Sequence, residues 1–166
     1  GTDCTIISYS RMTHVAIEAA AALDKEGIST EIVDLRSLRP LDEDAIVDSV
    51  RKTHRCVVVH EGWPYGGVGA EVADRVQRLA FDWLDAPILR VTSLDVPMPY
   101  NAKLEQLCMP QPGRVIDAVK RVVNRGVAQG RSTTSSPRSR PTRRPWSSVP
   151  STRARCSSSS SAPARR

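Results

Sequence analysis

The segment EGWPYGGVGAEV, residues 61–72, has the glycine content of a ligand-binding loop. Gly66, Gly67 and Gly69 allow tight turns and close approach of the backbone, and a helix that starts in such a loop can hold an anion at its N-terminus. A dinucleotide-binding G-x-G-x-x-G motif would have to begin at Gly67, and Val72 then replaces its third glycine. We therefore expect these glycines to permit close packing of a helix against its sheet or a partner chain. A nucleotide-binding α/β module that uses this loop is the alternative.

The histidines and cysteines do not have the spacing of a catalytic or metal centre. His60 and Glu61 end a valine-rich run, where α/β folds often bind ligands, but neighbouring strand residues point to opposite faces, so we do not expect one acid/base pair. The four cysteines lie roughly 50 residues apart without a C-x-x-C pair. No P-loop and no G-x-S-x-G elbow occurs in the sequence. We therefore expect no catalytic role for the histidines and no metal site formed by the cysteines, and the missing motifs disfavour nucleotide hydrolysis and α/β-hydrolase chemistry.

Two short segments combine aromatic residues, methionine and proline. Both could cap the local core, but Trp, Tyr and Met are enriched at subunit interfaces. We therefore expect both segments to lie in an interface with a partner chain. The first comprises Trp63, Pro64 and Tyr65, and the second, a proline-constrained extended loop, contains Pro97, Met98, Pro99 and Tyr100.

Strand-like runs alternate with helix-like periodicity along the first 125 residues. Short β-branched runs predict strands, and apolar residues three and four positions apart predict helices between them. Parallel strands need long crossovers, so the alternation predicts an α/β fold with a mostly parallel sheet covered by helices on both faces. The predicted strands cover residues 4–8, 29–35, 55–60 and 88–92, and the predicted helices cover residues 12–23, 41–50, 68–83 and 115–123. The apolar face expected for the third helix comprises Val68, Val72, Val76, Leu79, Ala80 and Trp83.

Charge divides the chain into two parts. All 18 acidic residues precede residue 126, whereas 9 of the 24 Lys and Arg residues follow residue 125, so the net charge of +6 arises in the tail. The tail is rich in Ser, Pro and Arg and has too few apolar side chains to offset the entropy of folding. We predict a domain at residues 1–125 and a disordered basic tail at residues 126–166, either a solvated extension or an out-of-frame translation.

A nucleic-acid-binding arm is the third interpretation of the tail. Arginines can neutralise phosphates and release counterions. However, Trp146 is the single aromatic residue among these arginines, so there is no regular interleaving for base stacking, and no fold motif of a DNA or RNA reader is present. We therefore expect nucleic acid not to be a partner.

Two features concern the cellular setting and the extent of the chain. There is no stretch of 18 apolar residues and no signal peptide, so we expect no membrane insertion, and a bacterial cytoplasm or an organelle matrix as the location. The first residue is Gly1, and an apolar strand follows almost at once. We therefore expect a fragment from which an N-terminal partner domain has been cut.

Five segments carry a family resemblance over residues 1–125, in order and without large gaps. EGWPYGGVGAE and LDAPILRVTSLDVPMPY are the most specific parts, whereas DLRSLRP is shared widely among transketolase-like enzymes. The chain resembles the transketolase-type C-terminal domain in the beta subunit of thiamine-diphosphate-dependent 2-oxo acid dehydrogenases. The pyruvate dehydrogenase type is nearest, and the acetoin and branched-chain types are the alternatives. The segments are GTDCTIISYSRM, EIVDLRSLRPLDEDAI, VVVHEGWPYGGVGAEV, FDWLDAPILRVTSLDVPMPY and LEQLCMPQPGRVIDAVKRV.

The resemblance implies an oxidative decarboxylation in which the acyl unit passes to a lipoyl group. It implies that thiamine diphosphate with magnesium is bound by domains absent from this chain, so the fragment is expected to be inactive alone. The implied partners are an alpha subunit and a second beta subunit in a heterotetramer, and the subunit-binding domain of the dihydrolipoyl acyltransferase. Asp85 matches an acidic residue that takes part in this last docking, and its alternative role is that of a turn residue before Pro87.

Overall fold

The computed structural model describes residues 1–123, which contain one four-stranded sheet. All strands are parallel, in the order β2-β1-β3-β4, and Thr5 of β1 lies level with Glu31 of β2 and Cys56 of β3. The expected parallel sheet is therefore confirmed. The strands are β1 (Cys4–Ser8), β2 (Thr30–Asp34), β3 (Cys56–Val59) and β4 (Leu89–Val91).

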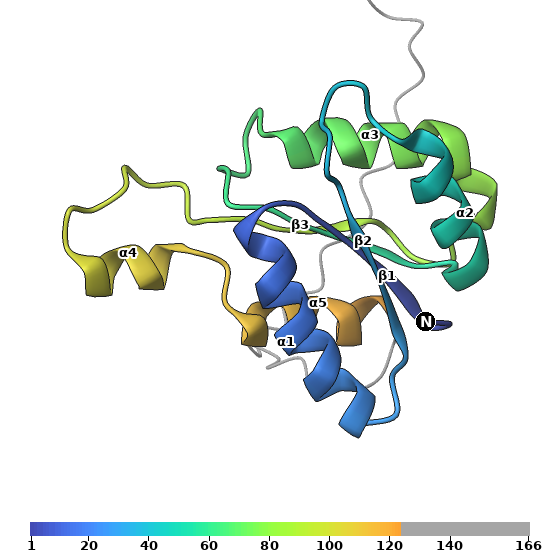
Figure 1. Cartoon of the computed structure of the whole chain (residues 1–166), viewed down its shortest axis with the longest axis horizontal. Helices are drawn as coiled ribbons and strands as arrows, with labels where there is room; N and C mark the ends of the chain where they lie inside the picture. The colour runs from blue at the N-terminus through green and yellow to red at the C-terminus, as the bar shows by residue number, and fades with distance from the viewer. Residues whose placement is uncertain (124–166) are drawn as a thin grey trace, which may run out of the picture. The chain divides into compact units, whose positions relative to one another are not determined.

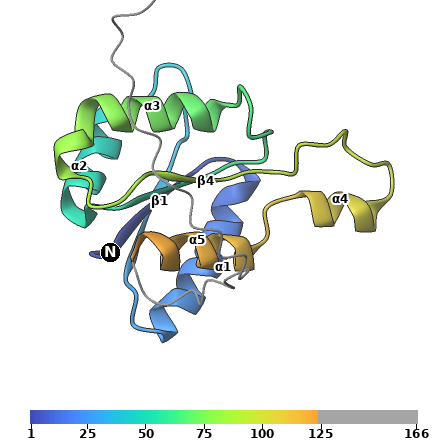
Figure 2. The ribbon, with the colours of Figure 1, turned by 180° about the vertical axis from the view of Figure 1, so that it is seen from behind.

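Helices cover both faces of the sheet, as expected. In Figure 1, α2 and α3 lie above the strands and α1 and α5 lie below them, and the reverse view in Figure 2 shows the same two layers. Successive strand residues point to opposite faces, so each strand supplies both layers: Ile6 and Val57 pack with α1 and α5, whereas Ile7 and Val58 pack with α2 and α3. The helices are α1 (Arg11–Lys25), α2 (Glu43–Thr53), α3 (Val68–Ala80) and α5 (Pro112–Val122).

The third helix is shorter than predicted. It ends at Ala80 and passes into a 3₁₀ turn, η1 (Phe81–Trp83). The prediction that Val68, Leu79 and Trp83 belong to its buried face is wrong, because all three are exposed. The buried stripe follows the four-residue spacing of Val72, Val76 and Ala80. Trp83 is exposed instead, and the guanidinium of Arg51 lies 4.3 Å from the centre of its ring.

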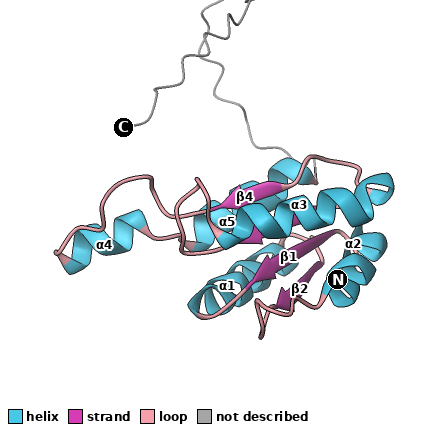
Figure 3. Ribbon diagram, turned by 90° about the horizontal axis from the view of Figure 1, so that it is seen from above, coloured by secondary structure: helices cyan, strands magenta, loops and turns pink. Residues whose placement is uncertain are grey.

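One helix, α4 (Ala102–Cys108), has no counterpart among the predicted elements. It follows the proline-rich loop, and its first turn is capped by the Asn101 side chain, which accepts a hydrogen bond of 2.9 Å from the backbone N–H of Lys103. Figure 3 shows α4 and its loop extending away from the layered body. Leu104 and Leu107 are exposed on it, so the helix has no stripe buried within the described residues that periodicity could have revealed.

The remaining expectations concern the tail and the membrane. The predicted domain boundary after residue 125 and the predicted disorder of residues 126–166 lie outside the described residues. Among residues 1–123, no helix combines the length and the apolar character that crossing a membrane requires.

Candidate functional site

The loops that follow β3 and β4 meet at the carboxyl edge of the sheet. Because the strands are parallel, their carboxyl ends lie side by side. The backbone N–H of Ser93 donates to the carbonyl of Gly62 at 3.2 Å, and Arg90 donates to the carbonyl of Pro64 at 2.9 Å. The structure thus places the loop that holds the first aromatic cluster against the start of the loop that holds the second.

The side chains of these two loops form an exposed apolar surface. Trp63 is 52% exposed and Tyr65 is 89% exposed, and Met98 and Tyr100 are also exposed. None of these residues belongs to either core cluster of the described chain. Several exposed apolar side chains on neighbouring loops are typical of surfaces that bind another polypeptide. We refer to Trp63, Tyr65, Leu94, Val96, Met98, Tyr100, Leu104 and Leu107 as the carboxyl-edge surface.

Beneath this surface, His60 is fully buried, with 0% exposure. Its Nδ1 accepts a hydrogen bond of 3.1 Å from the backbone N–H of Gly62, and its Nε2 has no hydrogen-bond partner within the part of the chain that is described. Burial, and secondarily the charge of Arg90, lower the pKa of His60. The imidazole of His60 is therefore enclosed and neutral near pH 7.

The three predicted close-packing glycines differ in their surroundings. A Cβ on Gly67 would lie 2.7 Å from the His60 ring, and one on Gly69 would lie 2.2 Å from it, so both positions bring backbone against the imidazole. Gly66 has open space around it and a φ of 67°, a left-handed conformation that favours glycine. Gly66 therefore serves the turn. Gly62 also approaches His60 closely, and sequence reasoning missed it because it stands outside the glycine-rich run.

Asp85 lies at the opposite, amino edge of the sheet, because it precedes β4. Its backbone N–H donates to the carbonyl of His54 at 2.9 Å, and its carboxylate, 59% exposed, lies 3.5 Å from the guanidinium of Arg55. His54 in turn donates from Nδ1 to the carbonyl of Trp83 at 2.8 Å. The interface residues predicted from the sequence therefore fall on two separate edges. We refer to Arg51, His54, Arg55, Trp83 and Asp85 as the amino-edge cluster.

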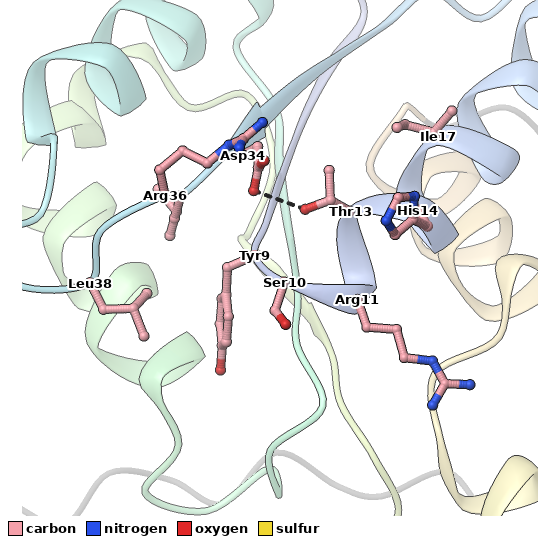
Figure 4. A pocket seen from close by; sticks show the side chains of 10 residues that line it. Tyr9, Ser10, Arg11, Thr13, His14, Ile17, Asp34, Arg36 and Leu38 are labelled. Atoms are coloured by element: carbon pink, nitrogen blue, oxygen red, sulfur yellow. Dashed lines mark hydrogen bonds and ion pairs between the residues drawn. The ribbon is translucent and has the colours of Figure 1, made fainter.

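A pocket of about 750 Å³ opens beside the carboxyl ends of β1 and β2, and the sequence did not predict it. In Figure 4, Thr13 points toward Asp34 across it, and the two side chains share a hydrogen bond of 2.9 Å. The carboxylate of Asp34 also forms an ion pair with Arg36, whose Nε lies 2.6 Å from it. His14 stands at the pocket and is exposed. The lining therefore presents no activated nucleophile with its base.

The three thiols among residues 1–123 offer no reactive centre either. Burial raises the pKa of Cys4 to about 12 and raises that of Cys56 as well, so neither forms a thiolate near neutral pH. Cys108 is also buried. No group of three or more His, Cys, Asp and Glu side chains within residues 1–123 could hold a metal ion.

The sequence and the fold match a known family. The family model "Transketolase, C-terminal domain" matches residues 1–115. The chain belongs to this family. The expected resemblance and the transketolase-like fold are thereby confirmed.

The transketolase C-terminal domain is similar in sequence to subunits of one enzyme. It is 51% identical over 122 residues to "Pyruvate dehydrogenase E1 component subunit beta" of Rhizobium meliloti (strain 1021), covering 74% of this chain and 26% of the relative. It is 47% identical over 125 residues to the mitochondrial beta subunit of Dictyostelium discoideum, covering 75% of this chain and 35% of the relative. The chain therefore spans about a quarter to a third of the length of these relatives.

Solved structures contain the same fold. The "Split gene transketolase, inactive beta4 tetramer" superposes with a TM-score of 0.64 at 31% identity, over 75% of this chain and 39% of that one. A 2-oxoglutarate:ferredoxin oxidoreductase from Magnetococcus marinus superposes with a TM-score of 0.52 at 15% identity, over 74% of this chain and 18% of that one. The second likeness bears on the fold alone.

Proposed function

We propose that this transketolase C-terminal domain is the non-catalytic assembly and docking domain of the beta subunit of a pyruvate dehydrogenase that transfers acetyl groups to a lipoyl acceptor. The observation that carries the proposal is the similarity of about three quarters of the chain to pyruvate dehydrogenase beta subunits, at 51% and 47% identity. Acetoin and branched-chain 2-oxo acid dehydrogenases are the alternatives, because residues outside this chain set the substrate.

The intact assembly, on this proposal, uses thiamine diphosphate with magnesium bound by other domains. Magnesium requires oxygen ligands such as carboxylates arranged around one point, and residues 1–123 contain no acidic cluster that could hold a metal. The described residues therefore do not fit the cofactor. On this proposal they contribute shape and contacts to the assembly, and the bond-making residues belong to its other domains.

The carboxyl-edge surface is proposed to contact the alpha subunit and a second beta subunit. Its support is the exposure of Tyr65, Tyr100 and Leu107 on loops and a helix that have no covering layer within residues 1–123. Aromatic side chains bury large areas at little entropic cost when a partner covers them, and such residues dominate the energetics of interfaces. Pro64, Pro97 and Pro99 restrict the backbone of the loops and reduce the entropy lost on binding.

Asp85 is proposed to receive basic side chains of the subunit-binding domain of the dihydrolipoyl acyltransferase. Its exposure and its place at an edge free of the carboxyl-edge surface support this role, because the two partners could then bind at once. Arg55, 3.5 Å from the Asp85 carboxylate, would compete with an incoming cation. Charge pairs of this kind steer association and fix orientation.

The setting proposed for the assembly is a bacterial cytoplasm or an organelle matrix. The relatives include a bacterial and a mitochondrial protein. Neither a membrane nor nucleic acid enters the proposal.

Sedimentation of the 166-residue chain with the alpha subunit from the same source tests the proposal. We expect a complex that Tyr100→Asp and Trp63→Asp weaken, because each buries a carboxylate in an apolar contact. Phe81→Asp is the matched control, since Phe81 is an exposed aromatic outside the carboxyl-edge surface. A chain that decarboxylates pyruvate by itself would overturn the non-catalytic role. Micromolar binding of NADH to the isolated chain would favour the nucleotide-binding alternative instead.

A further inference from the structure

The imidazole of His60 occupies a space that three glycines leave open. Its backbone N–H donates to the carbonyl of Val91 at 3.1 Å, which anchors the residue at the end of β3. A Cβ added to Gly62, Gly67 or Gly69 would lie 2.9, 2.7 or 2.2 Å from a ring atom. The ring thus fills the gap between the sheet and the loop that leads into α3, and the loop's conformation depends on it.

The hydrogen bonds of His60 require the neutral ring. Nδ1 accepts from the backbone N–H of Gly62 at 3.1 Å, so its lone pair is in use and the single proton of the ring is on Nε2. A second proton would go to Nδ1, where it would face the N–H of Gly62. Protonation would therefore replace an attractive contact with two opposed donors, inside a site with 0% exposure.

The surrounding charges do not compensate a protonated ring. Arg90 of β4 adds a like charge and, with burial, lowers the pKa of His60. The adjacent carboxylate, Glu61, has one buried oxygen without a hydrogen-bond partner within residues 1–123, but its charge acts on Tyr9, whose pKa it helps to raise, and not on His60. Glu71, in the first turn of the helix packed over His60, is paired with Arg75 at 2.9 Å. A protonated imidazole would thus lie near the cationic Arg90. Its Nδ1–H would also face the N–H of Gly62 instead of a hydrogen-bond acceptor.

We propose that His60 is an acid-sensitive latch whose neutral imidazole holds the segment of residues 61–69, the loop and the start of α3, against the sheet, and whose protonation releases that segment. The segment carries Trp63 and Tyr65, so acid would also displace these two residues of the carboxyl-edge surface. That last consequence rests on the function proposed above, whereas the latch itself does not, because it involves only contacts within the chain.

Nuclear magnetic resonance of the isotopically labelled 166-residue chain tests the latch, with pH lowered from about 7.5 to about 4.5 across the ordinary range of histidine. We expect the ring signals of His60 to titrate below about pH 6.5, the unperturbed value, and the amide signals of Gly62, Gly67 and Gly69 to move with the same midpoint. Titration of His60 without any response of the three amides would overturn the proposal.

Substitution of His60 provides the second arm. In His60→Asn, the side-chain oxygen can accept from Gly62 in place of Nδ1 and does not titrate, so the glycine amides should lose their response to acid. His14→Asn should retain it. An acid-induced shift of the glycine amide signals that persists in His60→Asn would refute the latch. If His60→Asn does not fold, the titration of the unmodified chain decides alone. Both measurements use the chain without a partner, so a failure of docking would leave their outcome unaffected.

Discussion

The hydroxyl groups of Thr5 and Thr53 lie 2.6 Å apart in the interior and connect β1 to the last turn of α2. Thr5 also lies 2.8 Å from the hydroxyl of Ser49, and all three residues are buried. A cluster of neutral hydroxyls is stable in a core only when its members satisfy one another. This polar contact therefore helps to position α2 on the sheet face that also carries the apolar side chains of Ile7 and Val58.

Thr5→Val should lower the free energy of unfolding by about 0.5–1.5 kcal/mol, because it removes one hydrogen-bond partner from the buried hydroxyls of Ser49 and Thr53, while Thr53 keeps the carbonyls of Ser49 and Arg55 as acceptors. Urea unfolding followed by far-ultraviolet circular dichroism measures the change. The control is Thr2→Val at an exposed position, which we expect to alter stability by no more than about 0.5 kcal/mol. Equal stability of the two variants would contradict the structural role assigned to Thr5.

Gly69→Ala should destabilise the domain by about 1–3 kcal/mol, because the new methyl group would lie 2.2 Å from the His60 ring and force the helix or the ring to shift. Gly113→Ala is the matched control. Nothing lies within 4 Å of its Cβ position, and it stands in the first turn of α5. At this position, alanine should leave the free energy of unfolding unchanged or raise it by up to about 1 kcal/mol. Thermal unfolding of the two variants distinguishes close packing from a generic glycine effect.

Acid should destabilise the folded chain through His60. Its pKa is lowered in the folded state, so the unfolded chain binds the proton first as the pH falls below about 6.5, the unperturbed value. Above that pH, His60 is neutral in both the folded and the unfolded chain, so its protonation does not reduce the free energy of unfolding. Below it, the contribution falls by at most about 1.4 kcal/mol per pH unit until the folded-state pKa is reached.

Urea unfolding at a series of pH values measures this loss. Between the unfolded-state and folded-state pKa of His60, the slope of the free energy of unfolding against pH should be smaller in His60→Asn by the equivalent of at most one proton. His14→Asn should leave the part of the slope due to His60 in place. A profile that is steeper in His60→Asn than in the unmodified chain would show that the sign assigned to His60 is wrong.

Asp85→Asn should weaken binding of the acyltransferase subunit-binding domain by roughly tenfold, equivalent to about 1.4 kcal/mol, and should reduce the dependence of affinity on salt. Isothermal titration calorimetry at two salt concentrations measures both. Asp82→Asn is the control, since Asp82 is also exposed and lies only three residues earlier. The loss of the exposed pair with Arg55 should change stability by no more than about 1 kcal/mol. Equal affinities of the two variants would exclude Asp85 from docking.

Local sequence patterns predicted the layered fold well because each core element carries its own signal. The valine run at residues 56–59 is apolar at every position, which is typical of a strand covered on both faces, and the structure buries all four of its residues. The short helix α4 carried no such signal, since Leu104 and Leu107 remain exposed. Its only local mark was Asn101, a helix-capping residue type.

The sequence by itself determined the parallel α/β architecture, the family and the presence of two apolar loops, because periodicity and motifs are properties of neighbouring residues. Only the tertiary structure separated Asp85 from Tyr100, since the direction of β4 places the residues before this strand at one edge of the sheet and the residues after it at the other. It also decided that His60 is enclosed by Gly62, Gly67 and Gly69. Close packing arises where distant backbone segments converge, and no single segment of sequence encodes the distance between them.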